Sequence, residues 1–330
     1  MDDYISKRIK YFNTSESLKS NQRTKDVFHY TSPEGIFSIL KNQKIQFTDC
    51  QFVNDKSEYN HITEVLKKVY DNISNELVND FLYRGIVDDI EKNYEHNSFS
   101  FCKSIESLDG EMEKMKITKK RYYIFCTTKI SDSLSMWNYY VKNDKHEGYN
   151  LQLGINKLLT CLSKIDNPDI DIYYGDVIYD NNIKMKELEI IIKELDQKYS
   201  DEVKKMTLEN DIINLKLKIV QQLFDYIASF RLFYKDDSFK EEKEYRFVIR
   251  MPMSFTNYNN DILKSDYTVK KGIIVPYCEL DISNKEVISA ITLSPLFEKE
   301  LAQNGLERLL ASLNIYKGVQ INQSRIPIRY

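Results

Sequence analysis

The chain has few residues that interrupt regular secondary structure, with nine glycines and six prolines among 330 residues. Scarce breakers predict long helices and strands joined by few flexible loops. No apolar run reaches the roughly 18 residues that a membrane-spanning helix needs, and the acidic start Met1-Asp2-Asp3-Tyr4 does not resemble a secretion signal. These absences predict a cytoplasmic protein that has no contact with a membrane.

Paired cysteines and a strong net charge are also missing. The five cysteines are odd in number and never spaced as C-x-x-C, a pattern that indicates neither a disulfide framework nor a structural zinc site. A net charge of −3 and a pI near 6.0 argue against a duplex nucleic-acid binder, which needs a basic surface. We therefore expect no bound metal and no nucleic-acid role that depends on a basic surface. The cysteines are Cys50, Cys102, Cys126, Cys161 and Cys278.

Aromatic residues are abundant instead, with 24 tyrosines and 16 phenylalanines, and the length suffices for a large core. Apolar runs with a period of two alternate with longer stretches of helical period, which predicts a mixed α+β fold. We expect a single domain over 1–330. Its β-rich core should come from about 25–58, 121–180 and 240–328, and helical insertions from about 59–118 and 184–234.

Two short strands far apart in the sequence carry polar residues on one face. The first is Val27-Phe28-His29-Tyr30-Thr31, and the second is Glu242-Lys243-Glu244-Tyr245-Arg246. Because side chains alternate along a strand, Glu242, Glu244 and Arg246 should share one face, with Tyr245, Phe247 and Ile249 in the core. We expect His29 and Glu244 to lie on neighbouring strands and to face one pocket.

Three other segments offer candidate ligand contacts, each with a simpler structural role. Trp137 and Tyr140 are three residues apart on a predicted short helix, so they form either an aromatic wall or part of the core. Asn54 precedes a helix and is most simply its N-cap. Arg231 would either neutralise a pyrophosphate or end an exposed helix.

The order and spacing of several motifs resemble the bacterial "domain of unknown function 2971" family over nearly the whole chain. Tyr245 stands where that family more often has tryptophan, which keeps the position aromatic. The motifs are His29-Tyr30-Thr31-Ser32, Phe52 to Glu58, Phe125-Cys126, Ser135 to Tyr140, Gly148-Tyr149, Glu242 to Arg246 and Ser324 to Arg329.

The chain also resembles, more distantly, the ADP-ribosyltransferase superfamily, which implies a split β-sheet core with large helical insertions. By this resemblance His29 holds the adenosine-side ribose of NAD, and Cys126-Thr127-Thr128 loosely matches a strand that buttresses nicotinamide. Glu244 matches the carboxylate that stabilises the ribosyl cation, with Glu242 as its partner. The nucleotide contacts expected on this basis are His29, Tyr30, Thr31, Asn54, Trp137, Tyr140, Arg231 and Arg246.

Three functions follow as alternatives. The first is an NAD-using transferase or NAD-cleaving enzyme that modifies a macromolecular acceptor, in a toxin-like or phage-defence setting with a partner protein. The second is a non-catalytic module that binds a small nucleotide. The third is a metal-dependent phosphoesterase built on Asp55, Glu58, Glu242 and Glu244, although no H-x-H or D-x-D pair supports it.

Overall fold

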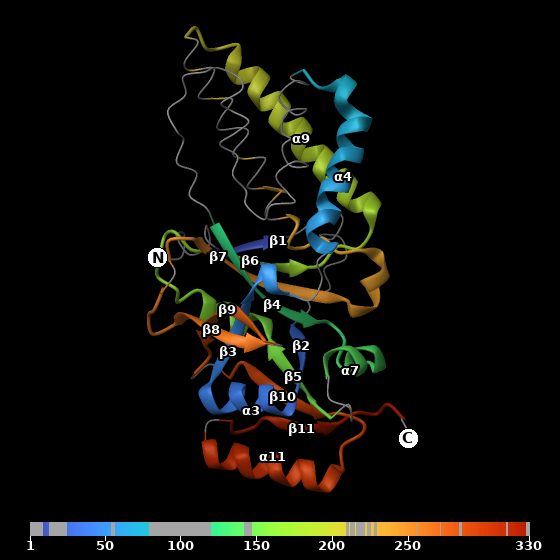
Figure 1. The fold of residues 1–330 in the computed structure, drawn as a ribbon, viewed down its shortest axis with the longest axis vertical. Coiled ribbons are helices and arrows are strands. Elements are labelled where there is room, and N and C mark those ends of the chain that lie inside the picture. The colour runs from blue at the N-terminus through green and yellow to red at the C-terminus, as the bar shows by residue number, and fades with distance from the viewer. Residues whose placement is uncertain are drawn as a thin grey trace.

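A computed structural model describes residues 9–12, 25–53, 57–78, 120–141, 147–208 and 211–327, and within the last range it leaves out 212–214, 216–221, 223–225, 228–229, 256, 271, 284–285 and 315. The side chains of 9–12, 57–63 and 203 are likewise outside the description. Figure 1 shows a central sheet with helices at both ends.

Within the described residues, eleven strands form one mixed sheet. Most pairs are antiparallel, and β1–β6 and β10–β11 are parallel. The strands are β1 (Ile9–Phe12), β2 (Asp26–Thr31), β3 (Lys44–Asp49), β4 (Lys120–Thr128), β5 (Tyr149–Gly154), β6 (Asp171–Asp176), β7 (Glu244–Pro252), β8 (Leu263–Lys270), β9 (Ile273–Asp281), β10 (Ile288–Leu293) and β11 (Gln320–Gln323).

The sheet divides at β4. One long edge of this strand pairs with β7 over its full length. The other edge meets β3 at Tyr123 and Ile124, and meets β2 only at Thr128. Two arms therefore leave the same edge, one through β3, β9 and β8 and the other through β2, β5, β10 and β11. A large apolar core joins these arms, with Phe47 and Leu280 from one and Val27 and Leu151 from the other.

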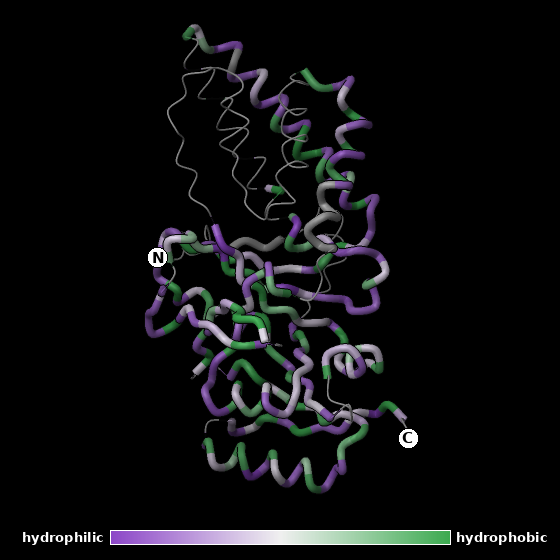
Figure 2. The backbone as a smooth tube through the Cα atoms, viewed as in Figure 1, coloured by the Kyte–Doolittle hydropathy of each residue, from purple (hydrophilic) through white to green (hydrophobic). Residues whose placement is uncertain are grey.

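Helices pack against the arms and also extend away from the sheet. Two of them, α3 (Pro33–Asn42) and α11 (Lys299–Leu313), lie at one end of the molecule, whereas α4 (Ser57–Ile73) and α9 (Asn181–Val203) lie at the other (Figure 1). Figure 2 shows that hydrophobic and hydrophilic residues alternate along α9 and α11. The apolar residues of α4 and α9 form a separate cluster with Ile227, Phe230 and Tyr234. Two shorter helices are α7 (Leu134–Tyr140) and α8 (Ile155–Leu162).

Local sequence signals explain several of these boundaries. Helix α3 begins at Pro33, because the Ser32 side chain accepts a hydrogen bond from the backbone N–H of Gly35 and Pro33 occupies the first turn. Strand β7 places Tyr245, Phe247 and Ile249 in the core as expected. The prediction of a mixed α+β fold is confirmed. In the part of the chain that the structure describes, no helix is long and apolar enough to span a membrane.

Candidate functional site

The start of β7 is held in an unusual local conformation. A 3₁₀ turn, η3 (Asp237–Glu242), ends at Lys243, whose φ of 41° lies in the left-handed region that non-glycine residues seldom adopt. The chain is fixed on both sides of this residue, because Lys129 N–H donates to the Lys243 carbonyl and Glu244 N–H donates to the Tyr179 hydroxyl. This turn brings together the carboxylates of Glu242, in η3, and Glu244, in β7.

Glu242 is therefore the last residue of η3 and not part of the strand, so the expected run of three polar residues on one strand face is wrong. The left-handed backbone at Lys243 interrupts the alternation between Glu242 and Glu244. The two carboxylates nonetheless meet, since Lys235 Nζ lies 2.7 Å from Glu242 Oε2 and 3.4 Å from Glu244 Oε2. The shared ammonium group of Lys235, and not a common strand face, brings the two carboxylates together.

Arg246 completes the cluster from the strand. Its Nε and Nη2 donate to Oε1 and Oε2 of Glu244 at 3.1 and 2.9 Å, the two-point geometry that favours an arginine–carboxylate pair. Its Nη1 donates to the backbone carbonyl of Leu232 at 2.7 Å. Lys235, Glu242, Glu244 and Arg246 are all buried, so water screens their interactions weakly. The two carboxylates and two cations balance in charge.

These contacts set the ionisation of the cluster. Burial alone would raise the pKa of Glu244, but the guanidinium of Arg246 and the ammonium of Lys235 outweigh it and lower the pKa to about 2. Burial and the neighbouring carboxylates raise the pKa of the Tyr140 and Tyr179 hydroxyls above their usual range. At neutral pH the cluster therefore contains an anionic Glu244 beside two phenols that keep their protons.

Tyr140 reaches the cluster from the end of α7. Its hydroxyl donates to Glu242 Oε2 at 3.2 Å, so that oxygen accepts from both a phenol and an ammonium group. The other oxygen, Glu242 Oε1, forms no hydrogen bond to the described part of the chain. Both oxygens of Glu244 are occupied by cations. Among the described residues, Oε1 of Glu242 is therefore the carboxylate oxygen of this pair that no hydrogen bond occupies.

His29 does not share a pocket with Glu244. Strand β4 separates their strands, and the register pairs Phe28 with Thr128 and Thr128 with Glu244. Directly paired residues project to the same side of a sheet, so Phe28 lies on the Glu244 face and His29 on the opposite face. The contact of the His29 ring with Phe125, at 4.7 Å between centroids, agrees with this placement. The expectation of neighbouring strands facing one pocket is wrong.

His29 instead occupies the point where the sheet divides. Its Nδ1 lies 3.1 Å from the backbone carbonyl of Cys126, which requires a proton on that nitrogen. Burial outweighs this hydrogen bond and lowers the pKa of His29 to about 4. The imidazole is therefore neutral at physiological pH and bonds to backbone where β2 and β4 separate.

Tyr30 and Trp137 have structural roles. Their rings pack edge to face with centroids 4.7 Å apart, inside a small cluster with Met136 and Val141. Trp137 is 1% exposed, and its Nε1–H donates to Asp132 Oδ1 at 2.8 Å. This is the core role considered for the single tryptophan, and its ring faces are already covered.

The remaining predicted contacts are dispersed. Arg231 is buried with its guanidinium 5.2 Å from the centre of the Tyr122 ring, and Tyr122 lies opposite Arg250 at the far end of β7 from Glu244. Thr31 follows His29 by two residues on β2 and so shares its face. Asn54 lies outside the described residues, as does Asp55 of the phosphoesterase alternative. The structure thus brings together Tyr140, Glu242, Glu244 and Arg246.

Sequence reasoning missed Lys235 and Tyr179 as members of the cluster, and it named Cys126 only as part of the strand expected to buttress nicotinamide. The Cys126 thiol forms a hydrogen bond that helps lower the pKa of Glu244. Lys235 had one local signal, since a lysine directly after Leu232-Phe233-Tyr234 continues a buried run and needs an anionic partner. Nothing in the sequence near Tyr179 indicates its contact with the start of β7.

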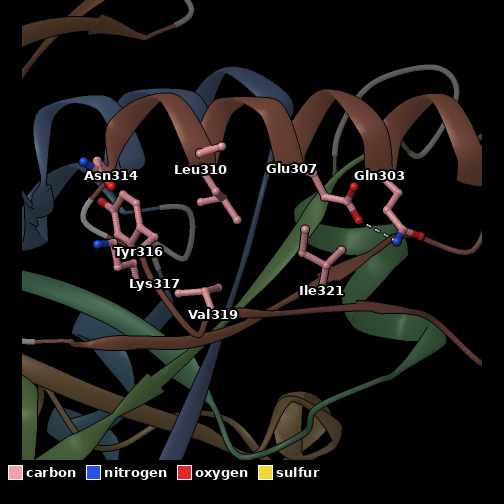
Figure 3. Close-up of a pocket in the computed structure, with 9 residues that line it drawn as sticks. Gln303, Glu307, Leu310, Asn314, Tyr316, Lys317, Val319 and Ile321 are labelled. Atoms are coloured by element: carbon pink, nitrogen blue, oxygen red, sulfur yellow. Dashed lines mark hydrogen bonds between the residues drawn. The ribbon is translucent and has the colours of Figure 1, made fainter.

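A separate hollow of about 360 Å³ lies between α11 and β11. Figure 3 shows Gln303 and Glu307 hydrogen-bonded to each other along α11, with Tyr316 and Ile321 beneath the helix. It contains none of the residues singled out in the sequence. Among the residues that the structure describes, no group of three or more His, Cys, Asp or Glu side chains is placed to hold a metal ion.

The fold and cluster define a mixed α+β protein with a divided sheet and a buried acid–base network at the start of β7. Residues 136–247, which include α7, the carboxylate pair and Arg246, match the family described as "Protein of unknown function (DUF2971)". This match confirms the predicted resemblance to that family over this part of the chain. Comparisons with curated proteins and with solved structures find no match.

Proposed function

We propose that this chain is an NAD-using enzyme that transfers ADP-ribose to a macromolecular acceptor or cleaves NAD, with its chemistry at Glu242 and Glu244. The observation that carries the proposal is the pair of buried carboxylates supported by Lys235, with a phenol beside them. The divided sheet supports the finer proposal that the core is of the ADP-ribosyltransferase type.

The chemistry needs a fixed negative charge. Departure of nicotinamide leaves positive charge on the ribose, and an anion already in place stabilises that transition state more than the neutral sugar. Glu244 stays anionic because Arg246 and Lys235 lower its pKa to about 2, but both its oxygens are engaged. In this proposal Glu242 contacts the ribose through Oε1, and Glu244 holds Lys235 in position for Glu242.

The opposite placement of His29 limits how a nucleotide would bind. A ligand at Glu242 lies on the face that carries Tyr140 and Phe28, so His29 makes no contact with it. The adenosine end must therefore be held by other residues on the Glu242 face.

One observation favours a second candidate, a nucleotide-binding module without catalysis. Glu244 is satisfied by two cations, which is also how a purely structural carboxylate is accommodated in a protein interior. In that case the cluster would fix the start of β7, and a nucleotide would bind beside it without reacting.

The test is to measure by chromatography the nicotinamide that the purified chain releases from NAD. We expect Glu242→Gln to lower the rate on the order of a hundredfold, because the amide keeps the shape but removes the charge. Asp171→Asn is the matched control. Asp171 of β6 pairs with Arg250, which lies on β7 six residues beyond Glu244. This control should retain the wild-type rate.

Equal rates for wild type and Glu242→Gln would contradict the catalytic assignment. A wild-type protein that releases no nicotinamide but gains thermal stability with NAD or ADP-ribose would support the binding module, because a ligand specific for the folded state raises its stability.

A further inference from the structure

The C-terminal motif Ser324-Arg325-Ile326 lies far from the carboxylate cluster in the sequence but is bonded to the loop that leads into α7. The Ser324 hydroxyl donates to Asp132 Oδ1 and the Arg325 backbone N–H donates to Asp132 Oδ2, both at 2.8 Å. Ile326 packs against the cluster that contains Trp137. Both oxygens of Asp132 thus bind the segment 324–325, close to the C-terminal end that Figure 1 shows near α7.

Asp132 also holds the helix itself. Its Oδ1 accepts from the indole N–H of Trp137 as well as from Ser324, so a single carboxylate joins the terminal segment to the buried face of α7. The loop before the helix has further support, since the Tyr30 hydroxyl donates to the Ile130 carbonyl and accepts from Ser133 N–H.

The far end of α7 carries the residue that reaches the candidate site. Tyr140 lies three residues after Trp137, so the two share a helix face, and its hydroxyl donates to Glu242 Oε2. With only seven residues, α7 is too short to be stable alone and depends on its tertiary contacts. The position of the Tyr140 hydroxyl therefore depends on what holds Trp137.

We propose that residues 324–326 act as a latch and that Asp132 is a positioning residue, which together hold α7 so that Tyr140 reaches Glu242. The effect of Tyr140 on turnover rests on the proposed function, in which its hydroxyl donates to the catalytic Glu242, whereas the coupling of the terminus to α7 does not. Release of the latch would turn Trp137 and withdraw the phenol from the carboxylate.

The first test is optical and independent of NAD. Trp137 is the only tryptophan, so its emission reports the environment of α7 alone. We expect Ser324→Ala and a chain ending at Gln323 to shift the emission to longer wavelength and to increase quenching by acrylamide. Ser312→Ala is the control, because Ser312 is exposed and its hydroxyl makes a local bond to the Leu309 carbonyl within α11. It should leave the emission unchanged.

Substitutions of Asp132 should give a graded response. Asp132→Asn keeps the Oδ1 acceptor for Trp137 and Ser324 but loses the acceptor for Arg325 N–H, whereas Asp132→Ala loses all three bonds. The emission shift should therefore be larger for Ala than for Asn. A folded Ser324→Ala or Asp132→Ala protein with unchanged Trp137 emission and quenching would overturn the latch.

The second test uses turnover of NAD. Tyr140→Phe removes the hydroxyl that contacts Glu242, and Ser324→Ala is expected to displace it. Each variant should lower kcat by about tenfold and leave KM nearly unchanged. The double variant should be no slower than Tyr140→Phe, because the latch acts through that hydroxyl. Additive losses would overturn the coupling. If wild type releases no nicotinamide, the proposed function fails while the emission tests still decide the latch.

Discussion

The two ends of strand β7 each hold an arginine–carboxylate pair on the same face, and they differ in what surrounds the pair. At the far end, Arg250 binds Asp171 of β6, and both side chains are partly exposed at 13% and 19%. At the start, Arg246 binds Glu244 with side-chain exposures of 2% and 5%. There a second carboxylate, a lysine and two tyrosines join the pair.

This difference shows what separates a structural pair from a candidate site. Water screens the attraction within a partly exposed pair. The buried pair of Arg246 and Glu244 also holds Lys235, which in turn binds Glu242, so a second carboxylate is buried at some cost in free energy. Proteins keep such arrangements when they have a function or specify a structure. At the start of β7 the additional charge is a second carboxylate, which shares Lys235 with Glu244.

The largest expected effect is on stability. Arg246→Ala leaves Glu244 buried without its two-point partner and should lower the free energy of unfolding by about 3–5 kcal/mol. Arg250→Ala at the other end should cost only about 1–2 kcal/mol, since water reaches Asp171. Urea titrations measure both. Equal losses at the two ends would remove the distinction between them.

The pH dependence of stability should distinguish the two faces of the sheet. The pKa of Glu244 is about 2 in the folded chain against an ordinary 4.5, so its contribution is present above pH 4.5 and is lost as the pH falls towards 2. The pKa of His29 falls from 6.5 to about 4, so the unfolded chain binds its proton first and stability declines between pH 6.5 and 4.

The shift of the His29 pKa corresponds to as much as about 3 kcal/mol. His29→Gln should flatten the decline between pH 6.5 and 4, and Glu244→Gln should flatten the decline at lower pH, in unfolding curves recorded across both windows. A decline between pH 6.5 and 4 that persists in His29→Gln would show that another group causes it.

The smallest effect should come from Tyr140→Phe. It removes one donor from Glu242 but leaves Lys235 in place, so the free energy of unfolding should fall by about 1 kcal/mol. Differential scanning calorimetry measures this change. A loss as large as that of Arg246→Ala would show that Tyr140 supports the whole cluster and not only Glu242.

Much of the fold could be predicted because the buried strands have strong patterns. Strands β4 and β7 are rich in apolar residues, and Ser32-Pro33 marks the start of α3. Strand β8 was not predicted, since it lies at an edge with mostly polar or exposed side chains such as Lys264 and Val269. Helix α8 was missed because it is short and Gly154 provides no side-chain cap.

The candidate site could be predicted only in part, for two physical reasons. The pairing of Glu244 with Arg246 follows from alternation within one strand, which a sequence displays. The faces of His29 and Glu244 depend on the register between β2, β4 and β7, and no property of the separate strands fixes that register. The left-handed Lys243 was equally hidden, because neither glycine nor asparagine occupies the position.

The division of the sheet at one strand has a consequence for the order of events during protein synthesis. Strand β4 pairs with Glu244–Pro252 along one whole edge, so this edge lacks its partner until more than a hundred further residues have been made. Pairings between residues so far apart in sequence are slow to form. Until β7 arrives, β4 presents unpaired backbone groups and the aromatic side chains of Tyr122, Tyr123 and Phe125, the features that promote association between chains. The nascent chain is therefore most vulnerable to aggregation between the synthesis of β4 and that of β7.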